Sequence, residues 1–329
     1  MVHFIDQTEV TPGTTGSFQL VDLSAYVSAS ATGVILQCDN STSGNGYYGA
    51  ICNGSSSTRT NFFALNCPYT FVHIIIKCDA DKKVQLYASG ANIHFYIIGY
   101  TEDEVVLYED PIDISMSTIN AWTDVDMSAG VVGGDTPLMA IVEYNLTTGF
   151  GSSALGFRDD GSTDNRTQVC YGGHLHTFVV GVTSNIFEGY IGSVTQDFYL
   201  VGYFKSGVTK ITNATDESLS STGLADLPVA IGTGHVGGFF EMVASSGGKT
   251  GTLQANDNIP DTVFVTLVNN KTFAIVPCDA DGIFEGNVSD TIVDFFLLGT
   301  IEAVTSGQPI HKRYGGTPHA RDQMPYRVW

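Results

Sequence analysis

Short runs in which apolar and polar residues alternate recur along the whole chain, and segments rich in Gly, Ser, Asn and Asp separate them. In "FVHIIIKC", residues 71–78, the side chains of Val72, Ile74 and Ile76 lie on one face of an extended chain. No apolar period of 3.6 residues is sustained in the sequence. The pattern therefore predicts an all-β protein, with short antiparallel strands packed as jelly-roll-like β-sandwiches.

Three stretches of the chain are copies of one another. Residues 78–100, 181–203 and 278–300 align without a gap; the first and third share 7 identities and the second and third share 8. Unrelated stretches of this length would share roughly one or two. Upstream of each copy lies a further strand-like run, and in this alignment His73 takes the place of His176.

A weaker sequence similarity marks the start of each repeat, at 17–26, 121–130 and 221–230. Each repeat therefore begins with a strand-like segment and closes with an aromatic strand, and the step from Gly99 to Gly202 to Gly299 is 103 and then 97 residues, which is the size of a domain. The sequence predicts three tandem sandwiches at 1–112, 113–215 and 216–303, followed by an extended C-terminal arm at 304–329.

The composition limits the possible partners. The formal net charge is -20, and only 15% of the residues are charged. Because phosphate groups attract clustered cations, this balance opposes binding of the body to nucleic acid or to an anionic membrane. The N-terminus does not resemble a secretory signal, and no apolar run approaches the length of a membrane helix. The six cysteines lack metal-site spacing, so we expect reduced, buried thiols, with a Cys38 to Cys52 bridge as the alternative.

Few residues suggest chemistry. His174 and His176 form an H-x-H pair that could hold a metal ion, but the sequence offers no third ligand, and two exposed histidines are the simpler interpretation. The segment "RDDGSTDNR", 158–166, is interpreted as a solvated hairpin turn, with contact to a partner or ion as the alternative. "CDAD", at 78–81 and 278–281, is interpreted as a strand end followed by an acidic turn. No catalytic or cofactor motif is present, so we expect no enzyme activity, no cofactor and no metal site.

The C-terminal arm differs from the rest of the chain. It is rich in Gly and interrupted by three prolines, which disfavours helix and regular strand. It is basic, whereas the body is acidic, and it carries the residue types that dominate protein interfaces. The predicted partner-binding residues are Lys312, Arg313, Tyr314, Arg321, Tyr326, Arg327 and Trp329.

The motifs "GFRDDGSTDNRT" and "FEGYIGSVTQDFYLVGYF" resemble the repeated β-domains of tailed-virus structural proteins, of the minor capsid, head-decoration, spike or tail-fibre type. The resemblance implies a bacteriophage virion protein, made in the host cytoplasm and exposed on the particle exterior. The first expectation is a structural protein that decorates or projects from the capsid and docks on other virion proteins through its arm. The alternative is a receptor- or glycan-binding fibre protein. Glycan hydrolysis is retained only because jelly rolls can host it.

Exterior viral β-proteins are frequently trimers, so the resemblance also implies a homo-oligomer, with a homotrimer favoured. The internal triplication offers an alternative, in which one chain imitates threefold symmetry by itself.

Overall fold

The structure is a computed structural model, and it describes residues 1–40, 49–53, 61–63, 71–146, 152–171, 175–244, 249–255, 263–267 and 271–303. These residues form six antiparallel four-stranded sheets and, apart from one 3-10 turn at Ser128–Gly130, no helix. The sheets pair into three sandwiches, so the predicted all-β fold is confirmed.

Sandwich 1 consists of β1 to β8. Its inner sheet has the order β1-β8-β3-β6 and its outer sheet the order β2-β7-β4-β5, which is the strand order of an eight-stranded jelly roll. The strands are β1 (Val2–Glu9), β2 (Gln19–Asp22), β3 (Gly33–Asn40), β4 (Gly49–Asn53), β5 (Asn61–Phe63), β6 (Phe71–Lys77), β7 (Lys83–Ala88) and β8 (Ile93–Thr101).

Sandwich 2 repeats this topology, with the inner order β9-β16-β11-β14 and the outer order β10-β15-β12-β13. Its strands are β9 (Val105–Asp113), β10 (Trp122–Asp126), β11 (Met139–Leu146), β12 (Ser152–Asp159), β13 (Gln168–Tyr171), β14 (Leu175–Gly181), β15 (Ile186–Ile191) and β16 (Gln196–Phe204). Because β9 pairs with β16, the second sandwich begins about eight residues before the position that the sequence suggested.

Sandwich 3 has the inner order β17-β24-β19-β22 and the outer order β18-β23-β20-β21. Its strands are β17 (Val208–Asp216), β18 (Gly223–Asp226), β19 (His235–Ala244), β20 (Lys249–Ala255), β21 (Val263–Leu267), β22 (Lys271–Pro277), β23 (Phe284–Val288) and β24 (Val293–Glu302). The three jelly rolls thus share one topology.

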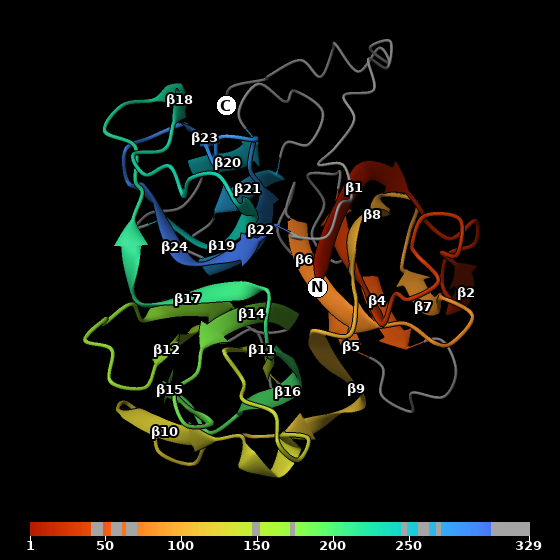
Figure 1. The fold of residues 1–329 in the computed structure, drawn as a ribbon, viewed down its shortest axis with the longest axis horizontal. Helices are drawn as coiled ribbons and strands as arrows, with labels where there is room; N and C mark the ends of the chain where they lie inside the picture. The colour runs from red at the N-terminus through yellow and green to blue at the C-terminus, as the bar shows by residue number, and fades with distance from the viewer. Residues whose placement is uncertain are drawn as a thin grey trace.

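The three sandwiches close around a central pseudo-threefold axis (Figure 1). The edge strands of the inner sheets meet there: β6 packs against β14 and β22, and β14 packs against β22. Ile75, Val179 and Ile275, one from each of these strands, are at most 1% exposed and belong to one continuous hydrophobic cluster. Each inner sheet is therefore buried on both faces, once by its own outer sheet and once by the other two sandwiches.

Strand register corrects the ungapped alignment at one point. Cys78, Val182 and Cys278 are equivalent, because each donates its backbone N–H to the residue just before the first paired residue of the neighbouring inner strand, which is Thr32, Leu138 and Val236 in turn. The turn after β14 is one residue shorter than its two counterparts, with Ser184 and Asn185 both at positive φ in a two-residue hairpin turn. His73 therefore corresponds to Thr177, and not to His176 as the sequence suggested.

Two of the three interfaces between sandwiches use the same contact. A Cβ added to Gly33 would overlap with Leu107 of sandwich 2, and one added to Gly237 would lie 2.6 Å from Cε2 of Phe4 of sandwich 1. Glycine at the start of the third inner strand thus lets an apolar side chain of the next sandwich approach the backbone.

The interface between sandwiches 2 and 3 reverses this arrangement. Met139 stands at the position of Gly33 and Gly237, and its Cε would lie 2.9 Å from a Cβ on Gly299. Lys210 stands at the position of Phe4 and Leu107. At this interface the large apolar side chain is Met139, on the strand that carries glycine at the other two interfaces. Lys210 takes the place of the apolar residue, Phe4 or Leu107, that contacts that glycine.

Candidate binding surfaces

The seven predicted binding residues of the arm, from Lys312 to Trp329, lie outside the described residues, as does His174. The structure therefore does not test whether these side chains bind a partner. The described residues end at Ala303, just before the arm, and the backbone N–H of Ala303 donates to the carbonyl of Gly234 at 2.7 Å.

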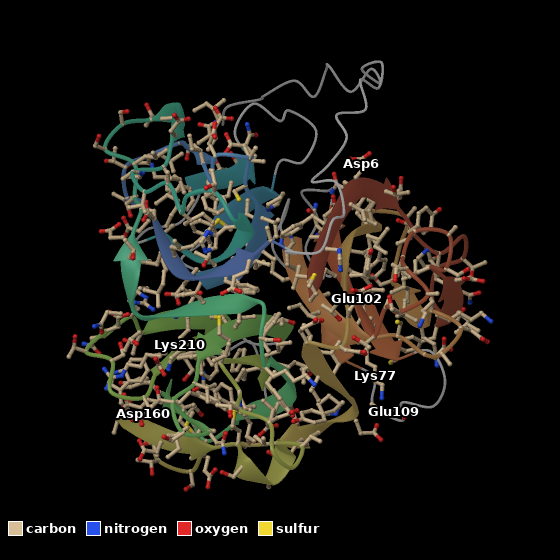
Figure 2. All side chains as sticks on the ribbon, in the orientation of Figure 1. Asp6, Lys77, Glu102, Glu109, Asp160 and Lys210 are labelled. Carbon is tan, nitrogen blue, oxygen red and sulfur yellow. The ribbon has the colours of Figure 1, made fainter. Side chains whose placement is uncertain are left out.

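The segment 158–166 is not the solvated turn that the sequence suggested, because it packs against sandwich 3. The Nζ of Lys210, on β17, lies 2.8 Å from Oδ2 of Asp159, whose side chain is 1% exposed. Asn213 accepts hydrogen bonds from Ser162 and Thr163, both at 2.9 Å. Figure 2 shows Lys210 at the junction of the two sandwiches. The partner contacted by this segment is thus another part of the same chain.

A buried charge cluster completes this interface. Lys271, at the start of β22, is 0% exposed, and its Nζ lies 2.7 Å from Oε2 of Glu241 on β19. The other oxygen of Glu241 accepts from Nε of Arg166 at 3.3 Å, and Arg166 also pairs with Asp164. Sequence reasoning missed this cluster because the neighbouring residues Asp164 and Arg166 are far in the chain from Glu241 and Lys271, and only the fold brings them together.

His73, on β6, lies at the contact with β22 and is 2% exposed. Its Nδ1 accepts the backbone N–H of Ile275 at 2.9 Å, and its Nε2 lies 3.4 Å from Oε1 of Gln37. Burial lowers the pKa of His73 to about 4. The ring is therefore neutral and joins sandwich 1 to sandwich 3, which is a structural role.

Metal and thiol chemistry find no support in the described residues. Among them, no group of three His, Cys, Asp or Glu side chains could hold a metal ion. Cys38, Cys52, Cys78 and Cys278 are free thiols, as expected, and burial raises the pKa of Cys278 to about 12. Cys78 and Cys278 come directly after β6 and β22 and are followed by the acidic turns that "CDAD" predicted, with Asp79 and Asp279 accepting the N–H of Lys83 and Ile283.

Two outer sheets carry an aromatic pair at the same place. In sandwich 2, Trp122 and Tyr190 face each other across β10 and β15, with ring centroids 5.7 Å apart. In sandwich 1, Phe18 and Tyr87 take these positions at 5.3 Å. All four side chains are partly exposed. In sandwich 3, Asn287 stands at the position of Tyr87 and Tyr190, and the residue opposite it on β18 is Leu224, so these positions hold no aromatic pair.

The ring of Trp122 is held in place by its neighbours. Its indole N–H donates to Oδ1 of Asn165 at 3.0 Å. The guanidinium carbon of Arg158 lies 4.2 Å from the ring centroid, and Arg158 is fixed in turn by two hydrogen bonds to Glu188. The Trp122 ring thus contacts Arg158 as well as Tyr190, whereas the Tyr190 ring contacts Trp122 and its hydroxyl donates to Oδ1 of Asn120 at 3.5 Å.

A groove of about 360 Å³ lies on sandwich 2. One wall is the segment 112–118, from the end of β9 toward β10, and the other is formed by β10 and the 3-10 turn. Gly130 contributes no side chain, and a Cβ there would lie 2.8 Å from Ile112 and 2.9 Å from Leu200. The apolar floor consists of Ile112, Ile114, Met116, Val125, Met127 and Leu200, and the rim carries Asp113, Asp124 and Asp126.

Comparisons with known proteins give no family. No protein-family model matches the chain, and no curated protein sequence does. One similar solved structure is the N-terminal CBM22-1-CBM22-2 tandem domain of Xyn10C from Paenibacillus barcinonensis, with 10% identity, covering 92% of this chain and 91% of that chain at a TM-score of 0.16. A score this low carries no argument about fold or function. Within the described residues, no helix has the length and apolar character of a membrane span.

Proposed function

We propose that the protein is a non-enzymatic structural protein of a virus particle, whose body is a single-chain counterpart of a trimer. The observation that supports this proposal most directly is the closure of three jelly rolls around one buried axis by β6, β14 and β22. Jelly rolls are recurrent in capsid and lectin domains, although the fold alone does not assign a function. The body buries the surfaces through which separate copies would form a trimer.

In this proposal the body displays three sandwiches on the exterior of the particle, and residues 304–329 attach it to other virion proteins. The body has a formal charge of -23 over residues 1–304, whereas the arm has four cations against Asp322, or 4 - 1 = +3. Opposite charge favours encounter with an acidic partner surface.

Removal of the arm tests this function. A chain that ends at Ala303 retains every described strand, so we expect its melting temperature to stay within about 2 °C of that of the full chain. Mass spectrometry of particles purified after co-production with either chain should find the full chain and at least tenfold less of the truncated one. Equal incorporation of the two chains would contradict the docking role of the arm.

Glycan binding is the second candidate function, and the aromatic pairs favour it. Aromatic rings that remain partly exposed on a sheet offer an apolar surface on which a sugar ring can stack, while their polar neighbours bond hydroxyl groups. Tyr87 and Tyr190 are the side chains placed for this contact in sandwiches 1 and 2.

A glycan array tests the second candidate. The full chain should bind a glycan, and Tyr190→Ala together with Tyr87→Ala should weaken that binding about tenfold, because each removes a stacking ring. Asn287→Ala, at the equivalent position of sandwich 3, is the matched control and should leave binding unchanged. An array that stays blank with the full chain would exclude this function.

A further inference from the structure

The groove of sandwich 2 combines an apolar floor with an acidic rim. Its floor residues come from β9, β10, β16 and the segments that follow β9 and β10. Asp113, Asp124 and Asp126 are all exposed at its edge. Hydrogen bonds from Ser128 lower the pKa of Asp126, which keeps this carboxylate ionised near neutral pH. The groove therefore suits a ligand that has cations beside apolar side chains.

The sequence around the groove strengthens this charge pattern. Residues 84–157 contain ten Asp and Glu and no Lys or Arg. Glu109 and Asp110 precede the groove on β9, and Glu109 lies at the periphery of the molecule in Figure 2. Since opposite charges are absent from this stretch, its own field is negative, and the cations Arg158, Arg166 and Lys205 of sandwich 2 lie beside Glu188, Asp164 and Asp135.

One segment of the chain has the complementary composition. Residues 305–329 carry Lys312, Arg313, Arg321 and Arg327 together with Tyr314, Tyr326 and Trp329. They make up 25 residues, which in extended form span about 80 Å, long enough to reach a neighbouring molecule. The cations match the rim of the groove, and the aromatic rings match its floor.

We propose that the groove of sandwich 2 binds residues 305–329 of a second copy of this chain. The proposal rests on the docking role given to the arm above and names its partner. An arm that binds the next copy joins bodies head to tail, as a heterologous contact does. Tyr26 and Ala230 stand at the position of Gly130 in the other two repeats, so the groove on sandwich 2 is built around a glycine that these repeats do not have.

A binding titration tests the proposal. A fluorescent peptide of residues 305–329 is added to the full chain and to the chain that ends at Ala303, and its anisotropy is recorded. We expect saturable binding that is tighter for the truncated chain, since its groove has no competing arm. The triple variant Asp113→Asn, Asp124→Asn, Asp126→Asn should weaken binding about tenfold or more, because three ion pairs are lost.

Two controls separate this site from general attraction between charges. Asp216→Asn with Asp226→Asn changes acidic residues at the corresponding places of sandwich 3 and should alter the affinity less than twofold. A peptide of the same composition in scrambled order should bind at least tenfold more weakly. Equal binding of the scrambled peptide, or equal loss in the sandwich 3 variant, would overturn the proposal.

Cross-linking identifies the copy that supplies the arm. In a mixture of isotopically light and heavy full chains, cross-links between residues 305–329 and the groove should join light to heavy chains. Cross-links confined to single chains would overturn the assignment to a second copy. If the peptide does not bind but truncation still removes the chain from particles, the groove is the wrong site while the docking arm stands.

Discussion

Replacement of Lys271 by methionine is expected to lower the free energy of unfolding by about 3–5 kcal/mol. The Nζ of Lys271 lies 2.7 Å from Glu241, and the two side chains are 0% and 4% exposed. Methionine fills a similar volume but leaves the Glu241 carboxylate buried with Arg166 as its remaining cation. Chemical denaturation of both proteins measures the difference.

The chain contains a matched control for this change. Lys249 and Asp290 form an ion pair with the same 2.7 Å separation, but the two side chains are 32% and 34% exposed. Because water screens this pair, Lys249→Met should cost less than about 1 kcal/mol. The double variant Lys271→Met, Glu241→Met removes both buried charges and should recover much of the lost stability. Equal losses for Lys271→Met and Lys249→Met would show that burial does not strengthen the central pair.

Glu217→Gln is expected to stabilise the protein by about 3 kcal/mol above pH 7 and to have little effect below pH 4.5. Glu217 is 1% exposed; its Oε2 accepts the N–H of Val229 at 2.9 Å, while its buried Oε1 has no hydrogen-bond partner among the described residues. Burial, with the nearby charge of Asp216, raises the pKa of Glu217 from 4.5 to about 7. Val10 and Ile114 stand at the equivalent positions of sandwiches 1 and 2, so an apolar environment is expected there.

The direction of the pH effect follows from proton binding. Between pH 4.5 and 7 the folded protein keeps the proton on Glu217 while the unfolded chain releases it. The stability of the native protein therefore falls as pH rises through this window, and glutamine, which does not ionise, removes that fall. Melting temperatures of both proteins from pH 4 to 8 test this result, with exposed Asp226→Asn as control. A constant difference between native protein and Glu217→Gln across this range would contradict it.

Much of the fold could be predicted from the sequence because it depends on local pattern and on repetition. Alternating runs such as 71–78 identify strands, and three copies of one pattern identify three domains of one type. The second buried face of the inner sheets could not be predicted this way. Ile75 and His73 lie on the face of β6 opposite the sandwich core, and burial of that face depends on contacts between sandwiches that alternation does not encode.

The register of β14 and the contacts of segment 158–166 could not be predicted from the sequence, because both depend on details that the repeat pattern does not contain. The turn at Ser184 and Asn185 is shorter by one residue than its counterparts. An alignment in which few positions are identical does not show this one-residue shift of β14. Charged residues in 158–166 resemble a solvated turn until Lys210 and Asn213 of the next sandwich are placed beside them. The sequence gives only a weak indication of the groove. Gly130 stands where the other two repeats have Tyr26 and Ala230, and residues 84–157 around it contain no Lys or Arg.

The reversed contact between sandwiches 2 and 3 fixes the order of the repeats. Between sandwiches 2 and 3, Met139 packs against the backbone of Gly299, and Lys210 pairs with the carboxylate of Asp159. At the other two interfaces a glycine contacts Phe4 or Leu107 instead. Three identical copies of any one sandwich could not reproduce both kinds of contact in a closed ring. The repeats have therefore become non-interchangeable, and covalent linkage in a single chain is what guarantees that each meets its proper neighbour.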